Sequence, residues 1–260
     1  MSNKLTIQIE SGVARITLNR PELRNAFDSG FIAELSQAVE QVATDPAVRV
    51  VVLGANGEAF CAGADLNWMR SVADYTHAQN VQDAGGLARM LNALYNCPKP
   101  TIARVQGDTY AGGMGLVSAC DVVVSVDTAH FCLSEVKLGL IPATISPYVI
   151  RAMGPRAAHR YALTAERFNA HEAHRIGLVH EVVSAQALDD QVAQWVKAFL
   201  SASPQALSSC KRLLHDVAHA PISESLIQMT AEAIAQSRAS DDGKDGVQAF
   251  LNKRKPHWLN

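Results

Sequence analysis

The feature that most constrains the fold is a change of pattern near residue 184. Before it, strand patterns alternate with helical ones, and after it every segment follows the 3.6-residue period of an amphipathic helix. A chain that alternates strands with helices builds an α/β core, in which helices cover a largely parallel sheet. We therefore predict an α/β core over residues 1–185 and a helical C-terminal domain over residues 186–260.

The same patterns predict the individual elements. Strands are expected at Leu5–Ile9, Val13–Leu18, Arg49–Leu53, Thr101–Val105, Asp121–Val126 and Leu178–Val183. Helices are expected after an N-cap at Asp28 or Ser29, through Leu87–Leu94, at Leu116–Cys120, and at Ala187–Phe199, Pro204–His215, Ile222–Ala239 and Gly246–Lys253.

Charge and composition exclude several classes of protein. The 260 residues carry a net charge of −2, which argues against a dedicated nucleic-acid-binding protein. We find no signal-peptide pattern and no apolar run of about 20 residues that could span a membrane, so a cytoplasmic protein without a membrane partner is expected. The five cysteines are scattered without the spacing of a metal site, and no metal is expected.

The segment Ala111–Gly115 reads Ala-Gly-Gly-Met-Gly and lies between a strand pattern and a helical one. Glycines at the start of a helix let a ligand approach the backbone closely. The first N–H groups of a helix have no partner within it, and with the helix dipole they favour an anion or a developing oxyanion. The alternative is that these glycines only permit tight packing between the helix and a strand.

A second loop of this kind, Phe60–Leu66, reads Phe-Cys-Ala-Gly-Ala-Asp-Leu. Two such loops could each donate one N–H to the same carbonyl oxygen, which indicates chemistry on a thioester. The alternative for Asp65 is a structural role as the N-cap of a short helix that carries Trp68 and Met69.

Glu135 is the third element, because it is a single carboxylate within the apolar segment from Phe131 to Pro142. It is either an ion-pair partner of Lys137 or Arg151, or a group kept in apolar surroundings for proton transfer. In the second case desolvation would raise its pKa toward the range that suits acid–base catalysis. Composition alone leaves both interpretations open.

The order of these three elements resembles the crotonase, or enoyl-CoA hydratase/isomerase, superfamily. Further stretches extend the resemblance over nearly the whole chain: Asn19-Arg20-Pro21 with Asn25-Ala26, Gly107 with Ala111-Gly112-Gly113, Arg175-Ile176-Gly177-Leu178-Val179, and Ala249-Phe250 with Lys253-Arg254. The resemblance implies a ClpP-like spiral of ββα units with a helical C-terminal domain, assembled as a homotrimer or as a hexamer of two trimers.

The resemblance also implies the site residues. Ala64 and Gly112 match the two N–H donors of the family's oxyanion hole, and Glu135 matches the second of the two glutamates used by the hydratases. Positions near coenzyme A are matched by Arg24, Ala62, Asp65, Leu66 and Lys253, the last often acting from a neighbouring subunit. Coenzyme A would enter as part of an acyl-CoA thioester substrate, and no prosthetic group is implied.

One position departs from the hydratase pattern, because Gly115 stands where the first glutamate is expected. Glu135 alone would then both activate water and deliver the proton to C2, which is feasible for syn addition. Family members that only shift a double bond also use one glutamate. The resemblance therefore implies an enoyl-CoA hydratase, with a Δ3,Δ2-enoyl-CoA isomerase as the alternative and a CoA-thioester-binding protein without catalysis as a third hypothesis.

The local sequence looks most like bacterial methylglutaconyl-CoA hydratases and relatives that act on isohexenylglutaconyl-CoA. The stretches that carry this resemblance are Ala64–Arg70, Phe131–Lys137, Ile145–Val149 and Arg160–Phe168. It implies a branched or carboxylated acyl group, whose second carboxylate would meet a cation. Arg70 and Arg104 are the candidates, and the alternative for each is an ordinary surface or salt-bridge residue.

Overall fold

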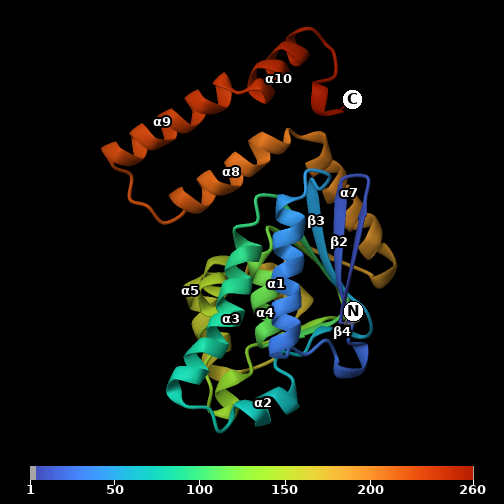
Figure 1. The fold of residues 1–260 in the computed structure, drawn as a ribbon, viewed down its shortest axis with the longest axis vertical. Coiled ribbons are helices and arrows are strands. Elements are labelled where there is room, and N and C mark those ends of the chain that lie inside the picture. Colours follow the sequence, from blue (N-terminus) through green and yellow to red (C-terminus); the bar gives the residue numbers. More distant parts are fainter. Residues whose placement is uncertain (1–3, 260) are drawn as a thin grey trace.

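A computed structural model describes residues 4–259 and confirms the predicted α/β class (Figure 1). Residues 1 and 260, the outer ends of the two predicted domains, lie outside the described part. The strands form a six-stranded sheet in the order β1-β2-β3-β5-β7-β10 and a four-stranded sheet in the order β4-β6-β8-β9. The pairs β1–β2 and β8–β9 are antiparallel, and the remaining pairs are parallel.

The six-stranded sheet contains the strands that the sequence predicts. They are β1 (Leu5–Glu10), β2 (Val13–Leu18), β3 (Val50–Ala55), β5 (Thr101–Val105), β7 (Val122–Val126) and β10 (Glu181–Val183). The four-stranded sheet has much shorter strands, none of them predicted: β4 (Ala59–Cys61), β6 (Asp108–Tyr110), β8 (His130–Cys132) and β9 (Phe168–Asn169).

From β3 to β8, successive strands alternate between the two sheets, and helices follow each pair. The strands β3, β5 and β7 lie in the large sheet, and β4, β6 and β8, which follow them in the chain, lie in the small one. The helices of this part are α1 (Ser29–Thr44), α2 (Leu66–Val72), α3 (His77–Tyr95), α4 (Gly112–Ala119), α5 (Ser146–Thr164) and α6 (Ala170–Arg175). This repetition is the spiral of ββα units that the resemblance implies.

The first helix shows how the sequence selects an element and its buried face. Asp28 has extended backbone and accepts a hydrogen bond from the Phe31 N–H at 2.7 Å, so it is the predicted N-cap of α1. The buried residues of α1 recur at helical spacing: Phe31, Ile32, Leu35, Ala38, Val39 and Val42. That face packs α1 onto the core, beside α3 (Figure 1).

The helices after β10 differ in how they meet the sheets. Helix α7 (Leu188–Ser201) packs against the large sheet, whereas α8 (Pro204–Val217), α9 (Glu224–Ala239) and α10 (Asp241–Leu251) form a group at one end of the molecule (Figure 1). Several large apolar side chains of these helices and of the connection between α8 and α9 are exposed: Leu214, Ile222, Ile227, Ile234, Val247, Phe250 and Leu251. The division of the chain into domains at residue 185 stays a prediction.

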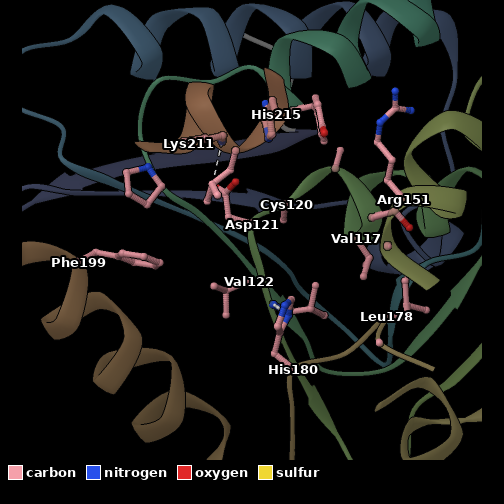
Figure 2. Close-up of a pocket in the computed structure, with 18 of the residues that line it drawn as sticks. Val117, Cys120, Asp121, Val122, Arg151, Leu178, His180, Phe199, Lys211 and His215 are labelled. Atoms are coloured by element: carbon pink, nitrogen blue, oxygen red, sulfur yellow. Dashed lines mark hydrogen bonds and ion pairs between the residues drawn. The ribbon is translucent and has the colours of Figure 1, made fainter. Parts of the chain in front are cut away.

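A cavity of about 490 Å³ lies where α8 meets the body of the protein (Figure 2). Lys211 of α8 forms an ion pair with Asp121 at 2.8 Å, and the His215 ring stacks on Tyr95 with the ring centroids 4.0 Å apart. These contacts attach α8 beside the N-terminal ends of β5 and β7.

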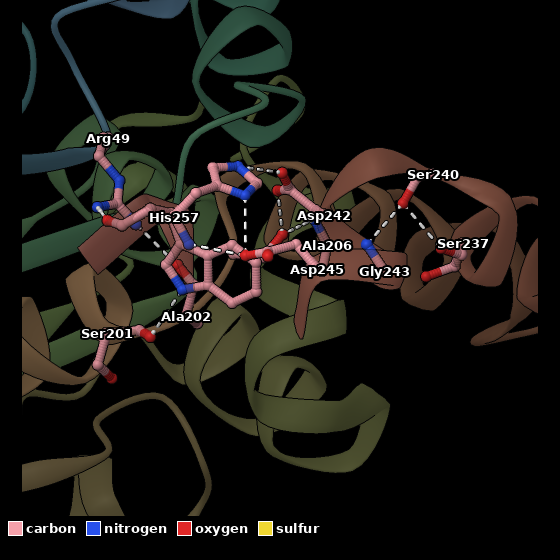
Figure 3. Close-up of polar contacts among 12 residues, drawn as sticks. Arg49, Ser201, Ala202, Ala206, Ser237, Ser240, Asp242, Gly243, Asp245 and His257 are labelled. Atoms are coloured by element: carbon pink, nitrogen blue, oxygen red, sulfur yellow. Dashed lines mark hydrogen bonds and ion pairs between the residues drawn. The ribbon is translucent and has the colours of Figure 1, made fainter. Parts of the chain in front are cut away.

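The C-terminal segment after α10 folds back onto the junction between α7 and α8 (Figure 3). Arg49, at the start of β3, donates hydrogen bonds to the carbonyl oxygens of Ala202 (2.7 Å) and Trp258 (3.2 Å). His257 lies between two carboxylates, with a ring nitrogen 3.1 Å from Asp242 and the other 3.1 Å from Asp245. The chain end is thereby fixed against α10.

Within residues 4–259, no helix combines the length and the apolar character needed to cross a lipid bilayer.

Candidate active site

Three segments of the candidate site leave the same edge of the four-stranded sheet. The parallel strands β4, β6 and β8 are adjacent, with Cys61 paired to Thr109 and Tyr110 paired to Cys132. Their carboxyl ends continue into the loop of Ala64, the start of α4 and the segment of Glu135, respectively. Ligands of α/β proteins commonly bind outside the carboxyl ends of parallel strands. The sheet therefore brings together the three elements that the sequence predicted as one site.

The loop of Ala64 is held by backbone hydrogen bonds on both sides of that residue. The Phe27 N–H donates to the Gly63 carbonyl and the Asp65 N–H donates to the Phe27 carbonyl, each at 2.7 Å. Ala64 itself forms a parallel bridge with Phe27 and is half-buried. Among the described residues, no acceptor receives the Ala64 N–H, so this donor is held in place and unpaired.

The second donor, Gly112, is the first residue of α4. The preceding Ala111 donates to the Cys132 carbonyl at 2.9 Å and has φ +47° and ψ −120°, a conformation that costs an alanine on the order of 1–3 kcal/mol. The Gly112 N–H has no acceptor within the described part of the chain, as expected for the first turn of a helix. Helix α4 thus starts earlier than the predicted Leu116, and its N-terminus faces the site.

The two donor loops touch each other at Gly63. A Cβ atom on Gly63 would lie 2.8 Å from the Ala111 Cβ and 3.7 Å from the Gly112 nitrogen. Gly63 also has φ +93°, which disfavours any other residue. The glycine is therefore required by the close approach of the loops, and this approach brings the Ala64 and Gly112 amides into one region.

Glu135 begins the short 3₁₀ helix η2 (Glu135–Leu138) and is half-buried. Its Oε2 atom is inaccessible to solvent and has no hydrogen-bond partner in the described structure. Burial raises the pKa of Glu135, while the residue's own backbone N–H lowers it to a smaller extent. No ion pair with Lys137 or Arg151 is formed, so that interpretation of Glu135 is wrong and the desolvated carboxyl is what the structure contains.

At Gly115, where the hydratase pattern has its first glutamate, the space for a side chain is filled by Ile145. Gly115 is fully enclosed, and a Cβ atom there would lie 2.4 Å from the Ile145 Cγ2 and 3.3 Å from the Leu91 Cδ1. Real Cβ atoms do not approach other atoms within 3.0 Å. A glutamate at this position therefore cannot be accommodated unless Ile145 moves. Of the carboxyls in these three segments, Asp65 is occupied as a helix cap and by Arg20, which leaves Glu135.

Two of the predicted coenzyme A residues, Arg24 and Ala62, lie next to the Ala64 loop. We call the region formed by Arg24 and residues 62–66 the coenzyme A corner. The Ala62 N–H donates to the Arg24 carbonyl at 3.0 Å, so the two backbones are adjacent. The Arg24 guanidinium is exposed and lies 3.6 Å from the Asp108 carboxylate, which partly neutralises it. The exposed cation is therefore placed beside the loop to which the resemblance assigned it.

Asp65 and Leu66 belong to the same corner. The Asp65 side chain accepts hydrogen bonds from the Asn67 N–H (2.8 Å) and the Trp68 N–H (3.2 Å), which confirms it as the N-cap of α2. Its second oxygen lies 3.3 Å from Arg20. The carboxylate is therefore already used, and only the Asp65 backbone and the exposed Leu66 side chain are left for a ligand.

Lys253 is not brought to this corner within one chain. It follows α10, which lies at the end of the molecule opposite α2 (Figure 1). The Lys253 side chain is exposed.

The two candidate cations for a second substrate carboxylate differ in their surroundings. Arg104 forms an ion pair with Asp189 of α7, with Nε 2.6 Å from Oδ1. Arg70, near the end of α2, is exposed and donates to the Asn67 side chain at 2.9 Å. No carboxylate within the described chain lies within ion-pair distance of Arg70, so it is the more available of the two.

Two residues that support the site were quoted in the sequence only as part of a motif. Asn25 is buried, accepts from the Arg20 N–H at 2.8 Å, and donates to the carbonyls of Asn56 (2.9 Å) and Ala59 (2.8 Å). The Arg20 guanidinium bridges Asp28 and Asp65. Together they fix the turn that holds the Ala64 loop.

The large cavity at α8 contains none of the three site residues Ala64, Gly112 and Glu135. Nor do the described residues contain a cluster of three or more His, Cys, Asp or Glu side chains arranged for a metal ion.

Comparison with known proteins identifies the family. The model of the enoyl-CoA hydratase/isomerase family matches residues 8–260, and the chain therefore belongs to this family. An enoyl-CoA hydratase of Alternaria alternata, ACTT6, is 34% identical over 252 residues, covering 96% of this chain and 82% of that protein. Enzymes of this family use CoA thioester substrates and need no prosthetic group.

Solved structures agree with this assignment. An enoyl-CoA hydratase from Shewanella pealeana superimposes with a TM-score of 0.96 at 44% identity, covering 98% of this chain and 96% of that one. An enoyl-CoA hydratase from Mycobacterium smegmatis gives a TM-score of 0.93 at 34% identity, with 99% of each chain covered. The fold of this chain is thus the crotonase fold.

Proposed function

We propose that the protein is an enoyl-CoA hydratase that adds water across the 2,3 double bond of an acyl-CoA thioester. The observation that carries this proposal is the Glu135 carboxyl, which is desolvated, has no partner for its Oε2 atom in the described structure and is attached to the same sheet edge as two unpaired backbone donors. A structural carboxylate would have a hydrogen-bond or ion-pair partner. A group that exchanges protons with a substrate needs a free oxygen and a raised pKa.

In this mechanism the Ala64 and Gly112 N–H groups hold the thioester oxygen while negative charge develops on it. Each donor of this type lowers a barrier by about 2.7–4 kcal/mol. Glu135, ionised at the start, takes a proton from water as the oxygen adds to C3. It then returns a proton to C2 on the same face, which collapses the enolate and restores the ionised carboxylate.

A Δ3,Δ2-enoyl-CoA isomerase is the alternative. It is favoured because the Ile145 side chain fills the space above Gly115. With Ile145 in that space, no second carboxyl is available from α4 to hold a water molecule. Glu135 alone suffices to move one proton between C2 and C4, and the same two amides would hold the dienolate oxygen.

The acyl group in this proposal is branched or carboxylated, as in methylglutaconyl-CoA. The support is the local resemblance together with the exposed Arg70 guanidinium, which follows the Ala64 loop on α2 and has no carboxylate partner within the described chain. Arg70 would pair with the distal carboxylate of the acyl chain. Arg24, and the backbone of Ala62 to Leu66, would contact the coenzyme A moiety.

We also place the enzyme in a homotrimer or a hexamer of two trimers. The support is the exposed apolar surface of α8 to α10 and the distance of Lys253 from the coenzyme A corner of its own chain. In an oligomer Lys253 would act on the phosphates of the ligand bound to a neighbour.

Three substrates separate these functions. Crotonyl-CoA and 3-methylglutaconyl-CoA should lose their enoyl absorbance on hydration, with the second turned over more efficiently. Absence of turnover with both would remove the hydratase assignment. A 3-enoyl-CoA that gains conjugated absorbance without hydration would establish the isomerase instead, and a protein that binds CoA thioesters but turns over none of the three would be a binding protein.

A substitution tests the carboxylated acyl group separately. Arg70→Ala should raise KM for 3-methylglutaconyl-CoA about tenfold, the typical loss of one partly exposed charged contact, and leave KM for crotonyl-CoA unchanged. Arg89→Ala, an exposed arginine on α3, is the control and should affect neither. Equal effects of Arg70→Ala on both substrates would show that Arg70 does not meet the distal carboxylate.

A further inference from the structure

The backbone that carries Glu135 is fixed at few points. Leu133 and Ile145 are each 1% exposed, whereas none of the eleven residues between them is buried. Within the described structure those eleven residues form hydrogen bonds only with near neighbours in the chain, including Leu140 N–H to Glu135 O (3.1 Å), Ala143 N–H to Ile141 O (2.8 Å) and, from just beyond the segment, Ser146 N–H to Pro142 O (3.0 Å). The segment is therefore a series of turns with one buried side chain at each end as an anchor, and η2 also contacts α5, the helix that begins directly after Ile145.

The carboxyl of Glu135 has no side-chain partner that could orient it. Its Oε2 atom accepts no hydrogen bond from the described residues, and the residue forms no ion pair there. The position of the carboxyl consequently follows the position of its backbone, and hence of the two buried anchors.

The Ile145 anchor rests directly on helix α4. It occupies the space above Gly115, with its Cγ2 2.4 Å and its Cβ 3.0 Å from where a Cβ on Gly115 would be. Gly115 lies three residues after Gly112, so it is about 4.5 Å further along the helix axis. The same turn of α4 therefore presents the Gly112 N–H at its start and receives Ile145 at its end.

We propose that the contact between Gly115 and Ile145 is a positioning device that sets the distance between the Glu135 carboxyl and the oxyanion donors. Gly115 is a glycine because it permits this close approach, and Ile145 is a positioning residue that acts through Glu135. This inference rests on the proposed function, since it concerns how the proton-transferring group is placed relative to the thioester.

The substitution Gly115→Ala tests the proposal. Normal van der Waals contact requires about 3.5 Å between carbon atoms, so Ile145 and the segment behind it must retreat by about 1 Å. A misplacement of that size lowers catalysis about 100-fold when reacting groups are involved. We expect kcat on crotonyl-CoA to fall by about that factor with KM changed less than about threefold, because binding does not depend on Glu135.

A second substitution separates positioning from general damage to the core. Ile145→Ala removes the Cγ2 atom, so Gly115→Ala in that background should cost less than about threefold in kcat rather than about 100-fold. Ile145→Ala alone should lower kcat about tenfold by loosening the segment. If Gly115→Ala fails to fold, the Ile145→Ala variant still tests the proposal, and unchanged kcat in that folded variant would contradict it.

Helix α3 offers a matched control. A Cβ on Gly86 would lie 3.9 Å from the Ile32 Cγ2, the same pair of residue types at an ordinary contact distance. Gly86→Ala should therefore leave kcat and KM unchanged.

The two proposals fail in different ways. Wild-type protein that turns over no enoyl-CoA refutes the proposed function. Active wild type with an equally active Gly115→Ala variant refutes the positioning role alone, and so would a crystal structure of Gly115→Ala in which the Glu135 backbone has not moved.

Discussion

At the scale of single residues, the burial of the Glu135 carboxyl suits catalysis but lowers the stability of the folded protein. Burial of a carboxyl without a partner destabilises its charged form and raises its pKa. The fold tolerates this because the other residues from 134 to 144 are half-buried or exposed and the buried core lies elsewhere. Such unpaired buried groups are uncommon in folded proteins, and a raised pKa in one of them is a functional indication rather than a structural one.

The first prediction concerns this carboxyl directly. Glu135→Gln keeps the shape of the side chain and removes its ability to exchange protons, so kcat should fall by about 10²–10⁴-fold with little change in KM. Glu40→Gln, on the exposed side of α1, is the control and should retain full activity. Steady-state kinetics with crotonyl-CoA provide the measurement, and a Glu135→Gln variant with near wild-type kcat would remove Glu135 from the mechanism.

The same substitution should change how stability depends on pH. Because the pKa of Glu135 is raised in the folded state, the folded protein binds more protons than the unfolded chain between pH 4.5 and that raised pKa. This residue therefore lowers the stability as pH rises through that interval. Glu135→Gln should be more thermostable than wild type at pH 7, with a smaller difference in Tm at pH 4. A wild-type advantage at pH 7 would mean that the ionised carboxylate has a stabilising partner.

Several single residues were predictable because their role is local. Asp28 and Asp65 are the expected helix caps, since a capping side chain bonds to backbone within three residues of itself. The role of Glu135 remained open in the sequence because it depends on which side chains from other elements reach it. Ile145 at Gly115 was not predictable at all, as 30 residues separate them and only the folded backbone brings them into contact.

At the scale of elements, the strands that build the site are the ones the sequence did not predict. β4, β6 and β8 have three residues each, too few for a periodic pattern to be recognised. The longer strands of the large sheet were predicted, because each is a continuous or alternating apolar run. The order of the site loops along the chain still indicated one site, since adjacent parallel strands bring their carboxyl ends together.

The start of helix α4 was predicted too late because its first turn is rich in glycine. Glycine is the poorest helix former apart from proline, so three glycines at residues 112, 113 and 115 predict a loop. Tertiary packing overrides that preference, and the strained Ala111 backbone turns the helix start toward the Ala64 loop. The strain lies next to a proposed oxyanion donor, where strained residues concentrate in enzymes.

The donor role of this region can be tested one amide at a time. Replacing Ala64 by L-lactate exchanges its N–H for an ester oxygen and changes no side chain. Because this N–H donates no bond to the described residues, the Tm should change little while kcat falls about 10²–10³-fold. The same exchange at Ala129, whose N–H donates to Val126 O at 3.2 Å, should lower the Tm and leave kcat unchanged. The reverse pattern would place the catalytic donors elsewhere.

At the scale of the whole molecule, the sequence predicted the C-terminal helices but not where they lie. Their period shows that each has an apolar face, yet it cannot say whether that face meets the core or another chain. In the structure α7 covers the large sheet, while α10 and the connection that precedes α9 leave large side chains exposed, among them Phe250 at 84% and Ile222 at 90%. A group of such side chains on adjacent helices is typical of a protein–protein contact.

The last prediction therefore addresses assembly. Phe250→Asp places a charge at the aromatic side chain of α10, which is 84% exposed. If the helices meet another copy of the chain, burial of Phe250 contributes about 2 kcal/mol, and losing it should weaken association at least about 30-fold, measured by sedimentation. Gln248→Asp, exposed on the same helix, adds the same charge without removing an apolar group and should leave the oligomer intact.

If Lys253 serves a neighbouring site, Phe250→Asp should also raise KM for acyl-CoA at low protein concentration, and KM should recover as the concentration increases. A monomeric wild-type protein with normal KM would mean that the exposed apolar surface has another partner and that each chain binds coenzyme A alone.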